Sequence, residues 1–390
     1  MALGIIPART ASSSGSIGES FSSRHNSLNF LRLLLALIVL ISHVIELGGF
    51  NVQNGLNGTS FGTLAVYGFF GISGYLIAGS AVRNHAGRYL WQRFLRIFPG
   101  FWTCLIVTAF FIGVIGWLFH PPVSHCGISC YFNARNGPDS YVYRDLFLRM
   151  NQESIAGTPV GGTAPLVWNG PIWTLSYEFL CYLILMGLAL TGVLRHRYLM
   201  LVTAIGLWGA VAVITLTPAF DNQFNLFRNL GSMNLLKLSA IFMVGAAIFV
   251  FRDRIPDSGW LALACGGLFL ASLYLPTGGR NPEFVFSTSD ILAPIVAYPL
   301  LWLGIHLPFQ RVGARNDYSY GVYIYGFPIS QLMLIWGVQR WGFVPYAVLS
   351  IALTAPFALI SWWIVERRAL SLKTLEPKAM LNWNLRSGVD

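Results

Sequence analysis

The chain of 390 residues is too hydrophobic to form ordinary soluble domains. Hydrophobic residues make up 55% of it and charged residues only 10%, and its mean hydropathy is +0.60. Soluble domains carry about 25% charged residues. The net charge of +10 is no evidence for nucleic-acid binding, because basic residues on a polytopic protein usually mark cytoplasmic loops. We therefore expect a membrane protein with no nucleic-acid partner.

Residues 1–28 precede the first apolar run. Small and polar residues dominate them, as in Ala11–Ser16, so we expect a disordered cytoplasmic tail. The tail lacks the basic flank, short apolar region and cleavage site of a signal peptide. The apolar run from Phe30 is long enough to stay in the membrane, and we interpret it as a retained first span.

Apolar segments separated by short charged loops are typical of helical membrane proteins and not of porin-type barrels. Segments close to 17–25 residues can cross a bilayer as helices. The sequence therefore predicts an all-α polytopic membrane protein with about ten transmembrane helices. The expected spans are residues 29–48, 61–81, 98–119, 170–190, 198–217, 235–251, 259–275, 290–307, 318–337 and 343–364.

The distribution of Lys and Arg predicts the orientation of these spans. With the N-terminus inside, 18 of the 25 basic residues fall on cytoplasmic segments or at a cytoplasmic span end. Both termini are then cytoplasmic. We expect one integral membrane domain at residues 29–368 and a cytoplasmic tail at residues 369–390.

Residues 120–169 form a loop on the predicted outer face. A loop this long usually has a function or its own structure. Cys126 and Cys130 either pair in an oxidising compartment or remain free thiols. A zinc site with His120 and His125 is a third alternative, but one cluster without a second paired motif is a weak signal, and we predict no metal site.

Glu178 is a carboxylate within an apolar span, which makes it a functional hypothesis by default. It lies about eight residues, or 12 Å, below the predicted outer surface. His43, in the outer half of the first span, is expected at a similar depth. The two residues can form a dyad in which the carboxylate orients the imidazole as a general base. The alternative is a packed polar pair that holds the bundle together.

Three arginines are expected near the cytoplasmic side. Arg32 precedes His43 by eleven positions, which places both near one helical face, and Arg93 and Arg96 are three positions apart. Together they suit phosphate groups, which arginine binds in a bidentate manner. The alternative for each arginine is the positive-inside rule with lipid headgroup contact. Two carboxylates at span ends, Asp290 and Asp317, are expected to be interfacial.

Five segments in this order resemble the membrane-bound acyltransferase family 3, which modifies bacterial surface and secreted polysaccharides. The resemblance covers about residues 28–368. The matching segments are Leu31-Arg32 followed by His43, then residues 69–77, 93–99, 173–178 and 318–325.

The resemblance implies an O-acyltransferase that carries an acyl group, most often acetyl, across the membrane. Acyl-CoA, the co-substrate, would place its phosphates near Arg32, Arg93 and Arg96. The acceptor would be a hydroxyl of a surface, secreted or lipid-linked saccharide, such as an exopolysaccharide or a lipopolysaccharide O-antigen. His43 would accept the hydroxyl proton or carry the acyl group transiently, and Glu178 would orient His43 or guide the acceptor.

Four further residues match the family's motifs and are assigned supporting roles: Ser73, Trp173, Ser176 and Tyr177. For Ser73, close helix packing by small residues is the alternative to a place along the donor channel. The resemblance also implies a multi-pass protein of the bacterial cytoplasmic (inner) membrane. Its partners would be membrane lipids and the polysaccharide biosynthesis machinery.

A transporter or flippase of a sugar or lipid-linked substrate is the alternative function, because it would also need buried charges. Transporters often contain paired broken helices in related halves. No such symmetry is visible in the sequence. Dependence on an acyl donor separates the two functions.

Overall fold

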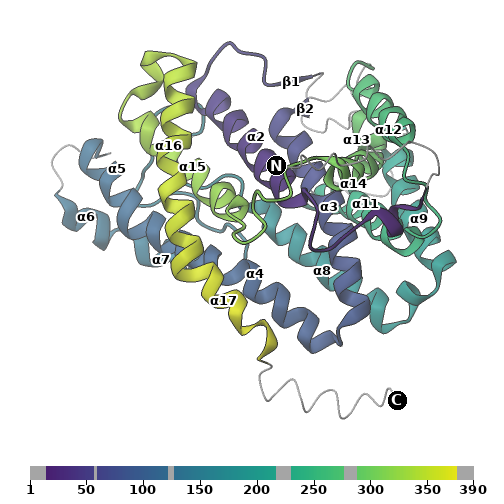
Figure 1. Ribbon diagram of the computed structural model, residues 1–390. Helices are drawn as coiled ribbons and strands as arrows, with labels where there is room; N and C mark the ends of the chain where they lie inside the picture. Colours follow the sequence, from purple (N-terminus) through teal and green to yellow (C-terminus); the bar gives the residue numbers. More distant parts are fainter. Residues whose placement is uncertain (1–14, 57–58, 122–126, 217–229, 276–287, 376–390) are drawn as a thin grey trace, which may run out of the picture.

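The structure is a computed structural model that describes residues 15–56, 59–121, 127–216, 230–275 and 288–375. Helices account for nearly all of its regular structure (Figure 1). Within the described residues, the one sheet is an antiparallel pair of two-residue strands, β1 (Gly55–Leu56) and β2 (Thr59–Ser60). The predicted all-α fold is therefore confirmed.

Each of the ten apolar segments coincides with a helix or a run of consecutive helices. Eight of these are long and apolar enough to cross a membrane, among the described residues. The other two, α12 and α15, have 14 and 17 residues, so the count of ten stays a prediction, as does the placement of the termini.

The bounds of the ten follow in chain order: α2 (Leu28–Gly48); α3 (Phe61–Arg83); α4 (Ala86–Val107) with η1 (Thr108–Ile112) and α5 (Gly113–Phe119); α8 (Trp173–Leu190); α9 (Arg197–Leu216); α11 (Leu230–Phe251); α12 (Gly259–Ser272); α13 (Thr288–Leu292) with η3 (Ala293–Val296) and α14 (Ala297–His306); α15 (Ser319–Ile335); and α16 (Phe343–Ser361) with η5 (Trp362–Glu366), α17 (Arg367–Ser371) and η6 (Leu372–Thr374). A short 3₁₀ turn, η2 (Val193–Arg195), joins α8 to α9, and another, η4 (Val338–Trp341), precedes α16.

The third span begins much earlier than predicted. Hydropathy placed its start at residue 98, but α4 begins at Ala86 and continues without a break to Phe119. The ring nitrogen Nδ1 of His85 accepts the N–H of Arg88 at 3.3 Å and caps the first turn. In this first part of α4, arginines alternate with stacked aromatic rings. It is therefore amphipathic, and its mean hydropathy is too low to mark it as part of a span.

α15 forms the centre of the bundle, because every residue from Ser319 to Leu334 is buried. It packs against α2 and α16, while α3 packs against α2 and α11. The α3 and α11 backbones approach closely at Gly74, where a Cβ atom would lie 2.0 Å from the carbonyl oxygen of Phe242. The predicted close packing by small residues beside Ser73 is present here.

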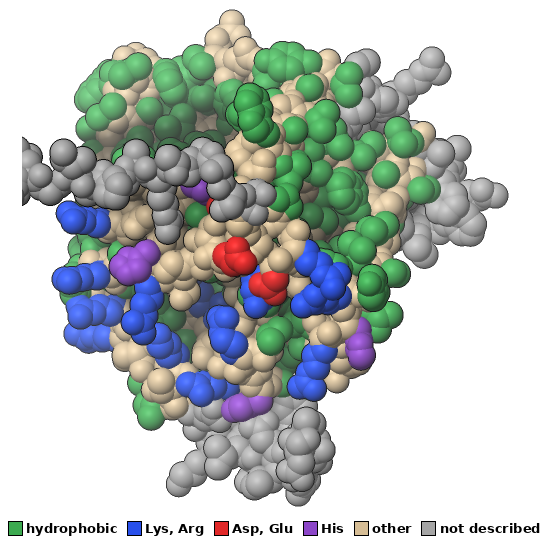
Figure 2. Space-filling model, turned by 45° about the vertical axis from the view of Figure 1, so that its right-hand side comes forward, with side chains coloured by type: hydrophobic (Ala, Val, Ile, Leu, Met, Phe, Trp, Pro, Cys, Tyr) green, Lys and Arg blue, Asp and Glu red, His purple; other side chains and the backbone are tan. Residues whose placement is uncertain are grey.

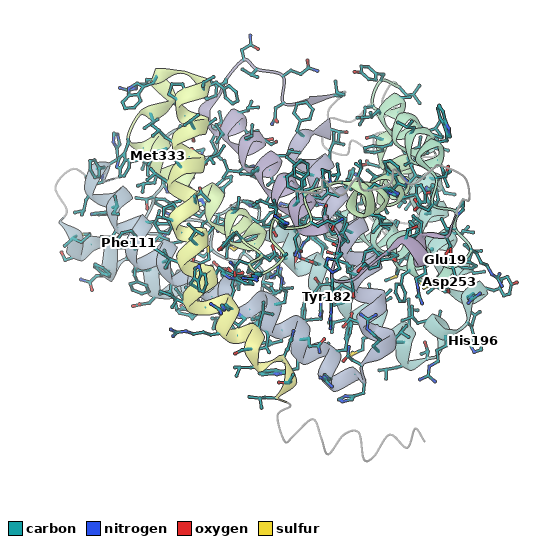
Figure 3. All side chains as sticks on the ribbon, viewed as in Figure 1. Glu19, Phe111, Tyr182, His196, Asp253 and Met333 are labelled. Atoms are coloured by element: carbon teal, nitrogen blue, oxygen red, sulfur yellow. The ribbon has the colours of Figure 1, made fainter. Side chains whose placement is uncertain are left out.

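The N-terminal segment is more ordered than predicted. Residues 1–14 lie outside the described part, but α1 (Ile17–Ser20) begins with a capping box between Ser16 and Glu19. Ile17 is fully buried, and its N–H donates to the carbonyl of Ile255 at 2.9 Å. Glu19 and Asp253 lie near each other at this junction (Figure 3). The expectation of disorder is therefore wrong for the segment from residue 15 onward.

The long loop predicted on the outer face is folded. It contains α6 (Ile128–Asn133) and α7 (Pro138–Asp145), which lie beside α5 and α4 (Figure 1). The buried amide of Gln152 accepts the Ser140 hydroxyl at 2.8 Å and donates to three main-chain carbonyls. Cys130 is disulfide-bonded, whereas Cys126 and His125 lie outside the described residues.

Candidate active site

Residues of α2, α3 and α8 line each of three neighbouring cavities. An inner cavity of about 430 Å³ includes Arg32, and an outer cavity of about 390 Å³ includes His43. A small cavity of about 40 Å³ lies between them and includes Glu178. Arg32 lines both the inner and the small cavity, whereas Thr174 and Tyr323 line both the small and the outer one. The small cavity therefore adjoins both of the others.

The inner cavity gathers the predicted arginines. Its charged lining residues are Arg32, Arg83, Arg93, Arg96 and Lys373. Lys and Arg side chains collect on the lower half of the face in Figure 2, whereas hydrophobic side chains dominate its upper half. The structure therefore brings together the arginines of α2 and α4, as the sequence predicted.

Asp317 joins two of these arginines. Its Oδ2 atom lies 2.8 Å from Nη1 of Arg32 and 2.6 Å from Nη2 of Arg96. Its Oδ1 atom accepts the N–H of Ser319 at 3.2 Å and the Ser319 hydroxyl at 2.5 Å. Burial opposes ionisation of this carboxyl, but the two guanidinium groups and Ser319 together hold the pKa of Asp317 well below its usual range. Asp317 is therefore an ionised carboxylate that links Arg32 to Arg96.

Arg93 differs from Arg32 and Arg96. Its guanidinium carbon lies 6.0 Å from the ring centroid of Tyr89 and 5.8 Å from that of Tyr182. Its Nε atom is buried, and the side chain makes no hydrogen bond or ion pair with any residue that the structure describes. Arg93 therefore presents a positive charge to the inner cavity with no carboxylate bound to it.

Glu178 lines the small cavity, which we call the constriction between the inner and outer cavities. Its Oε1 atom accepts the Tyr182 hydroxyl at 2.5 Å and the Ser73 hydroxyl at 3.2 Å. Tyr182, one turn further along α8, lies near the middle of the molecule (Figure 3). Glu178 thus connects α8 to α3, and Ser73 combines close helix packing with a place on the inner cavity wall.

His43 lies at the other end of the path. Its Nδ1 atom is 3.4 Å from Oε2 of Glu46, and its ring meets that of Phe327 edge to face at 5.1 Å. The outer cavity beside it is also lined by Trp173, whose side chain is partly exposed. The cavity thus combines an imidazole, a carboxylate and an aromatic face.

The predicted contact between His43 and Glu178 is not made in the described structure. Glu178 bonds to Ser73 and Tyr182, and it lines a different cavity from His43. The depth argument estimated only the height of each residue in the bilayer. α2 packs mainly against α3 and α15, whereas α8 packs against α3, α4 and α11, so the two side chains point into different parts of the path.

The remaining predicted residues lie close to Trp173. The ring of Tyr177 meets that of Trp173 at 5.4 Å, and the Ser176 hydroxyl donates to the Trp173 carbonyl at 2.6 Å. Of these three, only Trp173 is among the residues that line the three cavities. Ser176 and Tyr177 therefore support the first turn of α8.

The two carboxylates that were expected at the interface both have basic partners, and Asp317 is partly buried whereas Asp290 is buried. Asp317 is described above. Asp290 is 5% exposed, and its Oδ2 atom lies 2.7 Å from Nζ of Lys237, while the Tyr67 hydroxyl donates to Oδ1. All three residues line the outer cavity. An ionisable residue at the end of an apolar span usually pairs with another polar group. The position of Asp290 at such an end is the sequence signal that favours its burial.

Comparison with known proteins identifies the family. Residues 25–363 match the model of acyltransferase family 3, described as an acyltransferase domain. The chain belongs to this family. The resemblance stated from its motifs is therefore confirmed, and the protein is an integral membrane acyltransferase.

Two curated relatives match this acyltransferase over nearly their whole length. An O-acetyl transferase of Shigella phage Sf6 is 28% identical over 369 residues, which are 92% of this chain and 99% of the relative. Nodulation protein 10 of Rhizobium leguminosarum bv. viciae is 24% identical over 381 residues, 92% of this chain and 97% of the relative. No solved structure matches the acyltransferase.

Proposed function

We propose that this acyltransferase transfers an acyl group from cytoplasmic acyl-CoA to a saccharide hydroxyl on the opposite side of the bacterial inner membrane. Acetyl is the acyl group that the family resemblance favours. The observation that carries the proposal is a row of three adjoining cavities, which marks a path from the arginine-lined inner cavity past Glu178 to His43. A donor and an acceptor that enter from opposite sides can meet along such a path.

The inner cavity suits the phosphates of the donor. Arg93 carries a positive charge with no carboxylate bound to it, and Arg83 and Lys373 line the same cavity. Guanidinium groups bind phosphate oxygens in a bidentate manner, and lysine adds a point charge. Arg32, which Asp317 joins to Arg96, lines both the inner and the small cavity and so lies between the phosphate site and Glu178.

The small cavity suits a thin chain. Phe69, Phe70 and Leu175 line it together with Glu178. Only a small group fits a volume of about 40 Å³. A thioester arm can enter it from the inner cavity, while the bulky nucleotide end stays among the arginines.

His43 supplies the proton transfer. The acceptor hydroxyl gives its proton to the imidazole, its oxygen forms a bond to the thioester carbonyl carbon, and the carbon–sulfur bond breaks. The departing thiolate takes the proton, which restores His43 and leaves an ester and free CoA. In the other route that the sequence leaves open, the acyl group first resides on the imidazole.

The acceptor is proposed to be a saccharide in the outer cavity. The phage relative is named for O-acetyl transfer, which requires a hydroxyl acceptor. Trp173 offers an aromatic face, and Asp290 with Lys237 offers charged hydrogen-bonding groups in the same cavity. Partly buried polar groups of this kind favour a hydroxylated ligand over an apolar one. The polysaccharide assembly machinery would supply the acceptor.

The test is acyl-donor dependence of the purified protein in liposomes. We expect CoA release from acetyl-CoA and labelled acetyl on a saccharide extract of the source cells. His43→Ala should abolish transfer while leaving the fold intact, and His196→Ala, at an exposed histidine outside the cavities, should not. A wild-type protein that moves a sugar or lipid-linked sugar across the bilayer without cleaving acetyl-CoA would instead establish the transporter function.

A further inference from the structure

Glu46 lies one helical turn after His43 on α2 and presents its carboxylate to the ring. The atoms Oε2 of Glu46 and Nδ1 of His43 are 3.4 Å apart. Nδ1 is shielded from solvent and has no hydrogen bond to any described residue. The two atoms therefore lie within ion-pair distance of each other.

Two other segments hold Glu46 in place. The Asn54 amide donates to Oε1 of Glu46 at 2.8 Å and to the Ser42 carbonyl at 3.2 Å. The Thr163 hydroxyl donates to the main-chain carbonyl of Glu46 at 2.5 Å. Although the Glu46 side chain is 48% exposed, its carboxylate is therefore fixed at one oxygen and faces His43 with the other.

The other titratable groups of the outer cavity are engaged elsewhere. Asp290 pairs with Lys237 and accepts the Tyr67 hydroxyl. The Tyr323 hydroxyl bonds to Thr174 and donates to the Pro171 carbonyl. Among the described residues, Glu46 is the carboxylate within ion-pair distance of His43.

We propose that Glu46, and not Glu178, is the positioning residue for His43. Glu46 holds the imidazole proton on Nδ1, which leaves Nε2 as the atom that accepts the proton of the acceptor hydroxyl. When Nε2 becomes protonated, the Glu46 carboxylate stabilises the imidazolium until that proton passes to the CoA sulfur. The kinetic part of this inference rests on the proposed acyl transfer, but the tautomer of His43 does not.

The tautomer can be measured directly on the full-length protein in nanodiscs labelled with ¹⁵N-histidine. The seven histidines are resolved by subtracting the spectrum of His43→Gln. We expect the neutral His43 ring to carry its proton on Nδ1 in the wild type. Glu46→Gln should move the ring toward a mixture of tautomers, and Glu153→Gln, at an exposed glutamate of the outer loop, should leave it unchanged. A wild-type ring protonated on Nε2 would overturn the inference.

The kinetic arm uses acetyl-CoA and the same saccharide extract. Glu46→Gln should lower kcat about tenfold and shift its pH profile, with the KM for acetyl-CoA unchanged. Glu46→Asp should recover part of the loss. An unchanged pH profile in Glu46→Gln, with active wild type, would also overturn the inference. Wild-type protein that does not cleave acetyl-CoA would refute the proposed function, and the tautomer would then decide the inference alone.

Discussion

Oδ2 of Asp317 lies 2.6 Å from Nη2 of Arg96, and the same oxygen lies 2.8 Å from Arg32. One carboxylate just before α15 therefore joins the inner part of α2 to α4. The relationship divides the three arginines that the sequence grouped together. Arg32 and Arg96 are partly neutralised by Asp317, whereas Arg93 has no such partner within the described structure.

Replacing Asp317 by Asn should destabilise the protein, because it leaves two largely buried guanidinium groups without a carboxylate. Breaking a buried ion pair costs roughly 3–5 kcal/mol, and partial exposure here places the loss near about 3 kcal/mol. We expect a lower midpoint of denaturant unfolding in detergent. Folding lowers the pKa of Asp317, so the ionised carboxylate contributes fully to stability at pH values well above its unfolded pKa. This contribution to stability fades as the pH falls below about 4.

The matched control for this variant is Asp253→Asn. Asp253 forms an exposed pair with Arg252 at 3.6 Å, and such pairs contribute about 0–1 kcal/mol. Equal effects of the two substitutions would contradict the assigned role of Asp317.

Replacing Arg93 by Gln should weaken acyl-CoA binding with little effect on stability. Arg93 makes no ion pair within the described structure, so its removal leaves no buried carboxylate unpaired. A hydrogen bond to a charged group contributes about 1.5–3 kcal/mol, which predicts a rise in the Kd for acetyl-CoA of about tenfold or more. Calorimetry in nanodiscs measures both this Kd and its dependence on salt.

Arg195→Gln is the control for Arg93, because Arg195 is exposed on η2 and does not line the inner cavity. It should leave the Kd unchanged. A Kd that is the same in wild type and Arg93→Gln would show that Arg93 does not bind the donor.

Most of the fold was predictable because hydropathy alone marks apolar helices. It failed for the first part of α4, where arginines alternate with aromatic rings and lower the mean hydropathy. It also failed for Ile17, whose burial depends on the loop around Ile255. In both places the helix is defined by contacts that no local window contains.

The site was predictable only in part, for the same reason. Spacing placed Arg93 and Arg96 on one face, and the inner cavity contains both. The partner of Arg32 is 285 residues away, and the Lys237–Asp290 pair joins two other helices. Depth along the bilayer normal can be counted from a sequence, but the direction in which a helix faces depends on its neighbours. This is why Glu178 was paired with His43.

The bond between Tyr182 and Glu178 should be one of the stronger polar interactions in the bundle. A hydroxyl that donates to a carboxylate at 2.5 Å is a charge-assisted hydrogen bond. A double-mutant cycle of Tyr182→Phe and Glu178→Gln should give a coupling of about 1.5 kcal/mol in unfolding free energy. The cycle of Ser73→Ala with Glu178→Gln, at 3.2 Å, is the comparison and should give less. If the two cycles give equal coupling energies, or neither gives any, Glu178 does not anchor the helices at the constriction.

The outer loop should become less stable as the pH rises from 4 to 7. Burial raises the pKa of Asp145 to about 6, although the N–H groups of Asn151 and Gln152 donate to its Oδ1 atom. Because the folded pKa exceeds the unfolded value of about 3.9, the folded loop binds the extra proton, and the stability that this adds is lost as the pH rises through 6.

Asp145→Asn keeps the acceptor at Oδ1 and replaces Oδ2, which has no partner in the described structure. Protection factors of the Asn151 and Gln152 amides should therefore fall with pH in the wild type and stay constant in the variant. Asp139→Asn, at an exposed position of α7, is the control and should retain the wild-type pH dependence. A wild-type loop whose protection does not change between pH 4 and 7 would contradict the raised pKa of Asp145.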